Sequence, residues 1–420
     1  MNILFIHQNF PGQFKALAPA LARQGHNVVA MTLQPTQTEI WQGVRIVPYT
    51  ASRGSTPGVH PWISDFETKT IRAEACFRAA LQLKASGFSP TVIVAHHGWG
   101  ESLFLKEVWP AAKLGIYCEF YYLPQGTDTG FDPEFPSTDP TGDGCRLHLK
   151  NLNNLLHFAV ADSGISPTHW QASTFPEPFR SKITVVHDGI DTNTVAPNPQ
   201  VSLTLQNGNG TSLKLTRHDE VITFVNRNLE PSRGYHRFMR SLPEILRRRP
   251  RATILIVGGD GVSYGSKPTG EETWKNLFIN EVRPQISDQD WQRVRFLGHI
   301  PYQHFIPLLQ ISTVHVYLTY PFVLSWSLLE AMSAGCAVVA SDTPPLHEAI
   351  QHNKTGLLVD FFNPTELAES VCGLLANPQK RAALGKNARA FAKAHYDLQR
   401  VCLPQQLAWV ENLAHMTASH

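Results

Sequence analysis

Short apolar runs alternate with stretches of helical spacing along the first half of the chain. Unbroken apolar runs of five or six residues are typical of strands buried on both faces of a parallel sheet. We expect such strands at 3–7, 28–32, 44–48, 91–96, 115–120, 158–162 and 183–187, with helices at 14–24 and 67–85 between them. This alternation predicts a doubly wound α/β sheet.

A second series of apolar runs begins after residue 220. Its expected strands are 221–227, 253–259, 294–298, 314–318, 337–341 and 356–360, and the chain turns helical after that. Between the two series lie a segment rich in proline and asparagine, 191–200, and an NGNG sequence flanked by alternating runs. The NGNG sequence predicts a β-hairpin.

Two series of this kind predict two domains, because 420 residues exceed the usual size of a single hydrophobic core. We expect two Rossmann-like, doubly wound domains that face each other across a cleft, with ligand bound in that cleft. The expected domains are 1–195 and 196–385. A helical segment, 386–420, is expected to pack back onto the first domain.

The segment 321–342 predicts a short helix followed by a buried strand. Ser325 is suited to the N-cap, and Gly335 stands where a helix would end. Glu330 lies in the first turns of this helix. A carboxylate there can bind a sugar diol, and the helix N-terminus can bind a phosphate, which are the two ends of a nucleotide sugar. The alternative is that Glu330 caps its own helix or pairs with a neighbouring cation.

Composition is that of an ordinary globular protein, with 42% hydrophobic and 17% charged residues. A net charge of +2 gives no support for nucleic-acid binding. One basic run, 246–251, is expected to end a helix, and a membrane or polyanion contact is the alternative.

The six cysteines show no CxxC spacing, so we expect neither disulfides nor a zinc site. Without an export signal or a transmembrane run, a cytoplasmic protein is expected, with peripheral contact at the inner face of the membrane as the alternative.

Several ordered motifs together resemble those of one enzyme family. In the second half these are NRNLEPSRG, LIVGGDG, VRFLGHIPYQHFIPLL, SLLEAMSAGCAVVASD and HEAI with TGLLVD. In the first half they are HQNFPGQFKALAPALARQGHNV and KITVVHDGIDTNTVAP. The chain resembles retaining glycosyltransferases of the GT-B fold, family 4 (glycosyl transferase group 1), over essentially its whole length.

The resemblance implies a diphosphate clamp formed by Arg227 and Arg233. Two guanidinium groups after a strand can neutralise a nucleoside diphosphate, which is also the leaving group, without a metal ion. Arg233 stands where the family more often has lysine, which alters hydrogen-bond geometry rather than charge. A solvated surface position is the alternative for both. Glu330 matches the second glutamate of the family's paired-glutamate motif, which is implied to bind the ribose hydroxyls.

The first glutamate of that motif is absent, and Phe322 occupies its place. The backbone amides of Ser325 and Trp326 at the helix start are still expected to bind phosphate. Packing is the alternative to sugar stacking for both aromatic side chains. Gly259 in LIVGGDG is expected at the donor site, and main chain near His299 is expected to select the base.

In the first half, Gly12 and Gln13 follow the first strand, where a glycine lets the backbone approach a phosphate or sugar closely. His96 and His97 follow another expected strand and are expected to point at the cleft, although a lone histidine is more often structural. Glu119 stands where the family commonly has a histidine near the reacting sugar. Further candidates for acceptor contacts, with a polar loop as the alternative, are Asp128, Asp132 and Glu134.

The resulting hypothesis is a metal-independent hexosyltransferase that uses a UDP- or GDP-sugar, needs no cofactor and retains anomeric configuration. In such a transfer the leaving phosphate takes the acceptor's proton. The acceptor is left open as a glycan, a lipid-linked saccharide or a small molecule, and the oligomeric state is also open. The alternatives are a GT-B nucleotide-sugar epimerase and a non-catalytic nucleotide-sugar-binding scaffold. A dehydrogenase is not supported, because no GxGxxG follows a strand.

Overall fold

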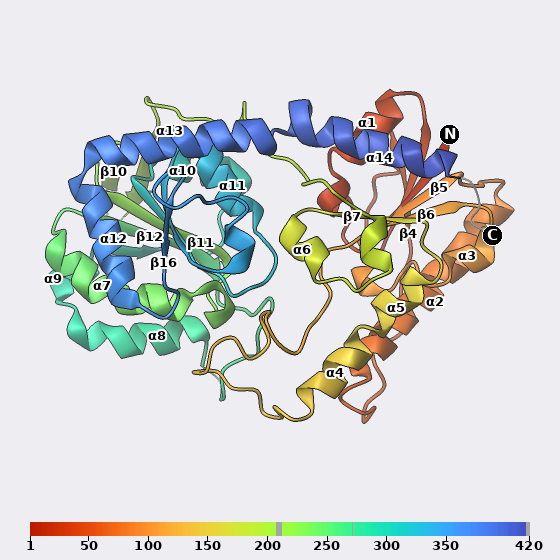
Figure 1. The fold of residues 1–420 in the computed structure, drawn as a ribbon, viewed down its shortest axis with the longest axis horizontal. Helices are drawn as coiled ribbons and strands as arrows, with labels where there is room; N and C mark the ends of the chain where they lie inside the picture. The colour runs from red at the N-terminus through yellow and green to blue at the C-terminus, as the bar shows by residue number, and fades with distance from the viewer. Residues whose placement is uncertain (207–211, 271, 417–420) are drawn as a thin grey trace. The chain divides into compact units, whose positions relative to one another are not determined.

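The computed structural model describes residues 1–206, 212–270 and 272–416, which divide into two compact units (Figure 1). The first unit is Met1–Gly189 together with the chain from Gln399 onward, and the second is Ile190–Leu398. Each unit is an α/β fold on a largely parallel sheet, which confirms the predicted fold class. In the described ranges, no helix is both long enough and apolar enough to span a bilayer.

The limits of the units differ from the expected boundaries at 195 and 385. Helix α13 (Pro378–His395) stays with the second unit, because it packs on α11 (Trp326–Ser333) and β15 (Ala337–Ser341). Glycine allows this close packing: a Cβ added at Gly385 would lie 2.3 Å from the Gly335 carbonyl oxygen. Of the C-terminal segment that was expected to pack on the first domain, only the part from Gln399 onward belongs to the first unit.

The sheet of the first unit has the strand order β3-β4-β2-β1-β5-β6-β7-β8, and only β3 and β4 pair antiparallel. Its strands are β1 (Asn2–Ile6), β2 (Asn27–Thr32), β3 (Ile40–Trp41), β4 (Val44–Pro48), β5 (Val92–Ala95), β6 (Lys113–Tyr117), β7 (Ser163–Ser166) and β8 (Ile183–Val185). The order of connection reverses between β1 and β5. The carboxyl ends of these two strands therefore flank the switch point at which doubly wound sheets bind ligands.

The helices of the first unit cover both faces of this sheet. They are α1 (Leu17–Arg23), α2 (Ser64–Ala85), α3 (Leu105–Val108), α4 (Asp143–Lys150), α5 (Leu152–Phe158), α6 (His169–Ser173) and α14 (Leu403–His415). Helix α14 lies against β5, β6 and α1. It reaches the sheet because β6 carries Gly115, where an added Cβ would lie 2.6 Å from both Trp409 and Leu413. The missing side chain is thus what lets this helix pack.

The prediction of a strand at 158–162 is wrong. Phe158 ends α5 and stacks on Phe179, with ring centroids 4.2 Å apart, while the strand is Ser163–Ser166. This strand is buried although half of it is serine. Its polar groups are satisfied internally, because the Ser166 hydroxyl donates to the Cys118 carbonyl oxygen at 2.8 Å. The apolar run therefore marked the last residue of a helix and the turn after it rather than the strand.

The sheet of the second unit has the strand order β13-β12-β11-β14-β15-β16 and is parallel throughout. Its strands are β11 (Val221–Asn228), β12 (Thr253–Gly259), β13 (Val294–Phe296), β14 (Val314–Tyr317), β15 and β16 (Leu357–Val359). All six predicted strands are confirmed. This is the Rossmann order 3-2-1-4-5-6, so the carboxyl ends of β11 and β14 flank its switch point.

The remaining elements of the second unit are helices and one hairpin. The helices, besides α11 and α13, are α7 (Tyr235–Arg248), α8 (Trp274–Val282), α9 (Asp288–Trp291), α10 (Tyr302–Ile311) and α12 (Pro364–Ala376). The predicted hairpin is confirmed as the antiparallel pair β9 (Ser202–Gln206) and β10 (Ser212–Thr216). Its NGNG sequence lies outside the described residues. Leucines of both strands pack against the core of the unit.

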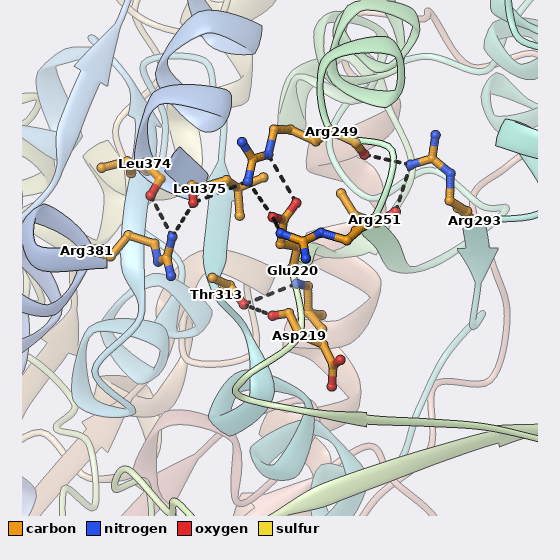
Figure 2. Close-up of polar contacts among 11 residues, drawn as sticks. Asp219, Glu220, Arg249, Arg251, Arg293, Thr313, Leu374, Leu375 and Arg381 are labelled. Atoms are coloured by element: carbon orange, nitrogen blue, oxygen red, sulfur yellow. Dashed lines mark hydrogen bonds and ion pairs between the residues drawn. The ribbon is translucent and has the colours of Figure 1, made fainter. Parts of the chain in front are cut away.

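The basic run 246–251 ends α7, as predicted, and its arginines are engaged within the unit (Figure 2). Arg249 donates to the carboxylate of Glu220 through Nε at 3.1 Å, and Arg251 lies 3.6 Å from the same group. Arg293 adds a hydrogen bond of 2.9 Å to the Arg249 carbonyl oxygen. The arginines at the amino edge of this sheet therefore tie the end of α7 to the start of β11.

Candidate functional site

A cavity of about 330 Å³ lies at the switch point of the second unit. The ends of β11 and β12 line it together with residues of α10 and α11, so residues that are distant in the sequence meet around one space. The cavity brings together five of the predicted site residues: Arg227, Arg233, His299, Ser325 and Glu330. The carboxyl edge of a parallel sheet is where ligands bind in this architecture.

Arg233 is held in place by uncharged groups. Its guanidinium donates to the Thr319 hydroxyl at 2.8 Å and to the Val323 carbonyl oxygen at 3.3 Å, and it lies 4.9 Å from the ring centroid of Tyr264. The residue is only 6% exposed, and it forms no ion pair within the described part of the chain. A buried cation without an acid beside it strongly favours an anionic ligand.

Arg227 adds a second cation at the mouth of the same cavity. It lies near the end of β11 and is exposed. Among the described residues it has no ion-pair partner. The two guanidinium groups thus supply charge from the rim and from the wall of one cavity, which suits a diphosphate.

Glu230 also lines the cavity, and the sequence analysis did not single it out. Its carboxylate is 1% exposed and accepts the backbone N–H groups of Ser263, Tyr264 and Gly265 at 3.2–3.3 Å. This fixes the loop that carries Tyr264, whose ring also lies 5.0 Å from that of Phe322. Glu230 therefore positions the aromatic ring that packs on Arg233.

Glu330, on α11, is buried and lines the same cavity. The Tyr302 hydroxyl donates a 2.6 Å hydrogen bond to its Oε1. Burial, together with the charge of Glu330, raises the pKa of Tyr302 well above its ordinary value, so this hydroxyl stays protonated at neutral pH. Tyr302 was not predicted as a site residue, although it lies within the motif VRFLGHIPYQHFIPLL. It presents the carboxylate of Glu330 in a fixed orientation.

The start of α11 is already hydrogen-bonded in part. Ser325 is the N-cap, as predicted, and its hydroxyl accepts the N–H of Ser327 at 3.3 Å. The N–H of Ser325 donates to the buried Tyr317 hydroxyl at 3.0 Å, so this amide is not directed at a ligand. Trp326 packs partly buried against the core. The predicted phosphate contact through the Ser325 amide therefore does not fit the geometry, whereas the Ser325 and Ser327 side chains line the cavity.

Gly259 and His299 lie against each other at the end of β12. A Cβ added at Gly259 would lie 2.1 Å from Nε2 of His299 and 2.8 Å from Oδ1 of Asn228. The glycine therefore leaves room for the imidazole, which lines the cavity. Phe322, by contrast, is 8% exposed and contacts the ring of Tyr264 rather than the cavity.

The first unit has its own cavity, of about 200 Å³, at the carboxyl ends of β5 and β6. It brings together His96, His97 and Glu119, as the sequence predicted from strand ends. His97 has both ring nitrogens engaged, at 3.0 Å from the Tyr117 carbonyl oxygen and 2.6 Å from Oδ1 of Asn154. Burial lowers the pKa of His97 to about 4. This ring is therefore a neutral structural support.

His96 lies deeper in the same wall. Its ring stacks between Trp99, at a centroid distance of 4.1 Å, and Tyr117, at 5.1 Å. Its Nε2 lies 3.7 Å from a carboxylate oxygen of Glu119. Burial lowers the pKa of His96 well below its ordinary value, so the contact with Glu119 involves a neutral ring.

Gly12 and Gln13 form the turn after β1. Gly12 has φ +45°, and an added Cβ would lie 2.1 Å from Nε2 of His7. Gln13 Oε1 lies 2.7 Å from the same nitrogen, so this turn is ordered by His7. The other acceptor candidates, Asp128, Asp132 and Glu134, line neither cavity, and Asp132 accepts the N–H of Glu134 at 3.1 Å within their loop.

Two family models match the chain one after the other. The model described as Glycosyl transferase family 4 group matches residues 24–195, and the model described as Glycosyl transferases group 1 matches residues 212–391. The chain belongs to the family 4, group 1 glycosyltransferases. The resemblance to family 4, group 1 seen in the sequence is thereby confirmed, and both cavities lie within matched ranges.

Three curated relatives are 24–29% identical to this glycosyltransferase family member over the ranges that align. The chain is 27% identical to spore coat protein SA of Bacillus subtilis over 54% of its length and 58% of that protein's. It is 29% identical to the D-inositol 3-phosphate glycosyltransferase of Corynebacterium efficiens, over 42% of the chain and 39% of the relative. These two matches thus span only part of each relative. A glycogen synthase of Mycobacterium tuberculosis is 24% identical over 92% of the chain and 86% of its own length.

Solved structures share the fold of this family member along nearly all of the chain. The sucrose-phosphate synthase of Thermosynechococcus elongatus superposes with a TM-score of 0.72 at 19% identity, covering 99% of this chain and all of that one. The HepE protein of Anabaena in complex with UDP-glucose gives a TM-score of 0.66 at 18% identity, again over 99% and 100% of the two chains. These structures establish the GT-B fold for the chain.

Proposed function

We propose that the chain transfers a sugar from a nucleoside-diphosphate donor to an acceptor hydroxyl. The observation that carries the proposal is Arg233, a buried guanidinium held by neutral groups and facing a cavity at the switch point of the second unit. An anionic ligand would compensate its charge. HepE, which has the same fold, was crystallised with UDP-glucose, and this supports a nucleotide sugar as that ligand.

Two groups of residues in the cavity bind the two ends of the nucleotide, the diphosphate and the ribose. Arg227 and Arg233 neutralise the diphosphate and stabilise the negative charge that grows on it as the glycosidic bond breaks. Glu330, oriented by Tyr302, accepts hydrogen bonds from the ribose hydroxyls. Two guanidinium groups supply the charge that a metal ion supplies in other transferases, which supports transfer without a metal.

The transfer proceeds with retention, as the family resemblance implies. The acceptor oxygen bonds to the anomeric carbon on the face that the phosphate leaves, the bond from that carbon to the phosphate oxygen breaks, and the acceptor proton moves to the departing phosphate. No carboxylate nucleophile is needed. The protein contributes position and charge stabilisation. The acceptor contacts are assigned to the cavity of the first unit, where Glu119 lies.

The test is binding followed by turnover. UDP, GDP, ADP and their glucose derivatives are titrated calorimetrically into the full chain, and the donor that binds is then offered with an acceptor panel. A glycoside product supports transfer, and the configuration of its new bond, read by proton NMR, tests retention. A free sugar epimer as the only product would support an epimerase, and binding without turnover on any acceptor would support a binding scaffold.

A pair of variants tests the site. Arg233→Gln removes the buried cation, and we expect donor affinity to fall at least tenfold. Arg247→Gln is the matched control, because Arg247 is exposed on α7 and pairs with Glu244 away from the cavity. Equal affinity in the Arg233 variant and the control would remove the assignment.

A further inference from the structure

The cavity of the first unit has an unusual collection of cations. Lys69 and Arg72 come from one face of α2, because they are three residues apart, and Lys150 is the last residue of α4. Lys69 forms an ion pair of 2.7 Å with Asp65. Arg72 and Lys150 form no ion pair anywhere in the described ranges. The Lys150 ammonium instead lies 3.6 Å from the ring centroid of Tyr122.

Neutral polar atoms of the same wall also lack partners. Asn153 donates through its amide to the His97 carbonyl oxygen at 2.8 Å, but its buried Oδ1 accepts no hydrogen bond from any described residue. Nδ1 of the buried His96 is likewise without a partner in the described chain. Asn153 and His96 are each 1% exposed and line the cavity. Buried polar atoms in this state favour a ligand that hydrogen-bonds to them.

The charge balance of the cavity favours an anion. The acids that line it are Asp65, which is engaged by Lys69, and Glu119, which is directed toward His96. Glu101 is buried nearby without a hydrogen bond, and burial raises its pKa to about 7, so it carries only part of a charge at neutral pH. Burial also lowers the pKa of Lys150, a cost that a bound anion would relieve.

We propose that this cavity binds a compact oxyanion, a phosphate monoester or a carboxylate, carried by the molecule that accepts the sugar. Arg72 and Lys150 bind the oxyanion, and Oδ1 of Asn153 accepts a hydroxyl of the same molecule. The cavity, at about 200 Å³, suits a group of monosaccharide size. The inference rests on the proposed function for the identity of the ligand as acceptor, but its binding site lies wholly within the first unit.

The test uses glucose, glucose 6-phosphate, glucuronic acid and inorganic phosphate as probes. Because phosphate can also bind at Arg233, each is titrated calorimetrically into the full chain carrying Arg233→Gln. We expect glucose 6-phosphate or glucuronic acid to bind at least tenfold more tightly than glucose, and the stronger of the two identifies the oxyanion. Inorganic phosphate that binds as tightly as glucose 6-phosphate would show a free-anion site and overturn the acceptor assignment.

Variants then place the binding. Arg72→Gln and Lys150→Gln, each added separately, are expected to remove the preference for the charged probes. Arg78→Gln is the control, because Arg78 lies on the same helix, pairs with Glu74 and does not line the cavity. Thermal unfolding of each variant shows whether it is folded, and Arg72→Lys serves if Arg72→Gln is not. Glucose bound as tightly as both charged probes, or a preference that survives in both variants, would overturn the proposal.

The two proposals fail separately. Arg72→Gln and Lys150→Gln with Arg233 intact should bind the nucleotide sugar as the unaltered chain does, because both residues lie in the other unit. A chain that binds no nucleotide sugar refutes the proposed function, whereas one that binds it but shows no preference for charged probes refutes only the oxyanion site.

Discussion

Tyr302 donates a 2.6 Å hydrogen bond to the carboxylate of Glu330, and so orients the acid that the family resemblance assigns to the ribose hydroxyls. Tyr302→Phe removes this bond and keeps the ring. A hydrogen bond to a charged group contributes about 1.5–3 kcal/mol. We therefore expect nucleotide affinity to fall at least about tenfold, measured by calorimetry, with Tyr264→Phe as the control that removes a hydroxyl elsewhere in the cavity. An unchanged dissociation constant would mean that Glu330 needs no orientation by Tyr302.

Glu330→Ala removes the carboxylate itself. The loss leaves the Tyr302 hydroxyl and the nucleotide's hydroxyl groups without their acceptor, which costs about 2–4 kcal/mol of binding free energy. Nucleotide-sugar affinity should therefore fall by a factor on the order of 30 or more. Glu369→Ala is the matched control, because Glu369 is exposed on α12. If both variants bind equally well, Glu330 does not contact the donor.

Glu230 holds the loop that carries Tyr264, and its replacement should act through that loop. Glu230→Ala leaves three backbone N–H groups without their acceptor, at a cost of about 1–3 kcal/mol in stability. Glu230→Gln keeps one acceptor oxygen and should lose less. We expect both the melting temperature and nucleotide affinity to decline in the order wild type, Gln, Ala. A variant with full affinity but lower stability would show that Tyr264 does not position Arg233.

The elements could be predicted where burial and composition agree. Strand β15 matches the predicted limits because all five residues are apolar or small and buried. The prediction missed strand β7 because two of its buried residues are serines. Their hydroxyls are satisfied by hydrogen bonds with a backbone carbonyl and with Trp409, so they can be buried although they are polar. The hydrophobic pattern detects the burial of apolar residues, as in β15, but not the burial of hydrogen-bonded serines, as in β7.

The site could be predicted only as far as strand ends and motifs reach. Arg227 lies near the end of β11 and Arg233 in the turn that follows, so sequence position alone places them at the switch point. Tyr264 comes from a loop after β12, and its contact with Arg233 depends on how Glu230 folds that loop. Contacts of this kind have no periodicity in the sequence. The same reason explains why the Ser325 amide, which faces Tyr317, was taken for a ligand contact.

Buried neutral histidines should make stability depend on pH. Burial lowers the pKa of His157 from 6.5 to about 3. Since the pKa is lower in the folded state, the unfolded chain binds the proton first as the pH falls. The contribution is therefore intact above pH 6.5 and is lost progressively from pH 6.5 down to about 3. Urea unfolding of the wild type should show a falling midpoint between pH 7 and pH 5.

His157→Gln tests this dependence. Its amide can replace the hydrogen bonds of the ring to Ser102 and the Asn153 carbonyl oxygen, but it does not titrate. The variant should lose less stability than the wild type over the same pH range. His148→Gln is the control, because His148 is exposed on α4. A control variant that flattens the pH profile as much as His157→Gln would contradict the assignment to the buried ring.

Alanine should change the stability of the first unit in opposite directions at two glycines, one that faces α14 and one inside α4. Gly115→Ala places a Cβ 2.6 Å from Leu413 and Trp409, so the helix must shift. Overpacking of this kind costs about 1–3 kcal/mol. Gly144→Ala, inside α4, meets no atom within 4 Å and removes conformational freedom from the unfolded chain, which stabilises by about 0.4–1 kcal/mol. Thermal unfolding should therefore shift down for the first variant and up for the second, and a Gly115 variant with an unchanged melting temperature would show that α14 does not depend on this close approach.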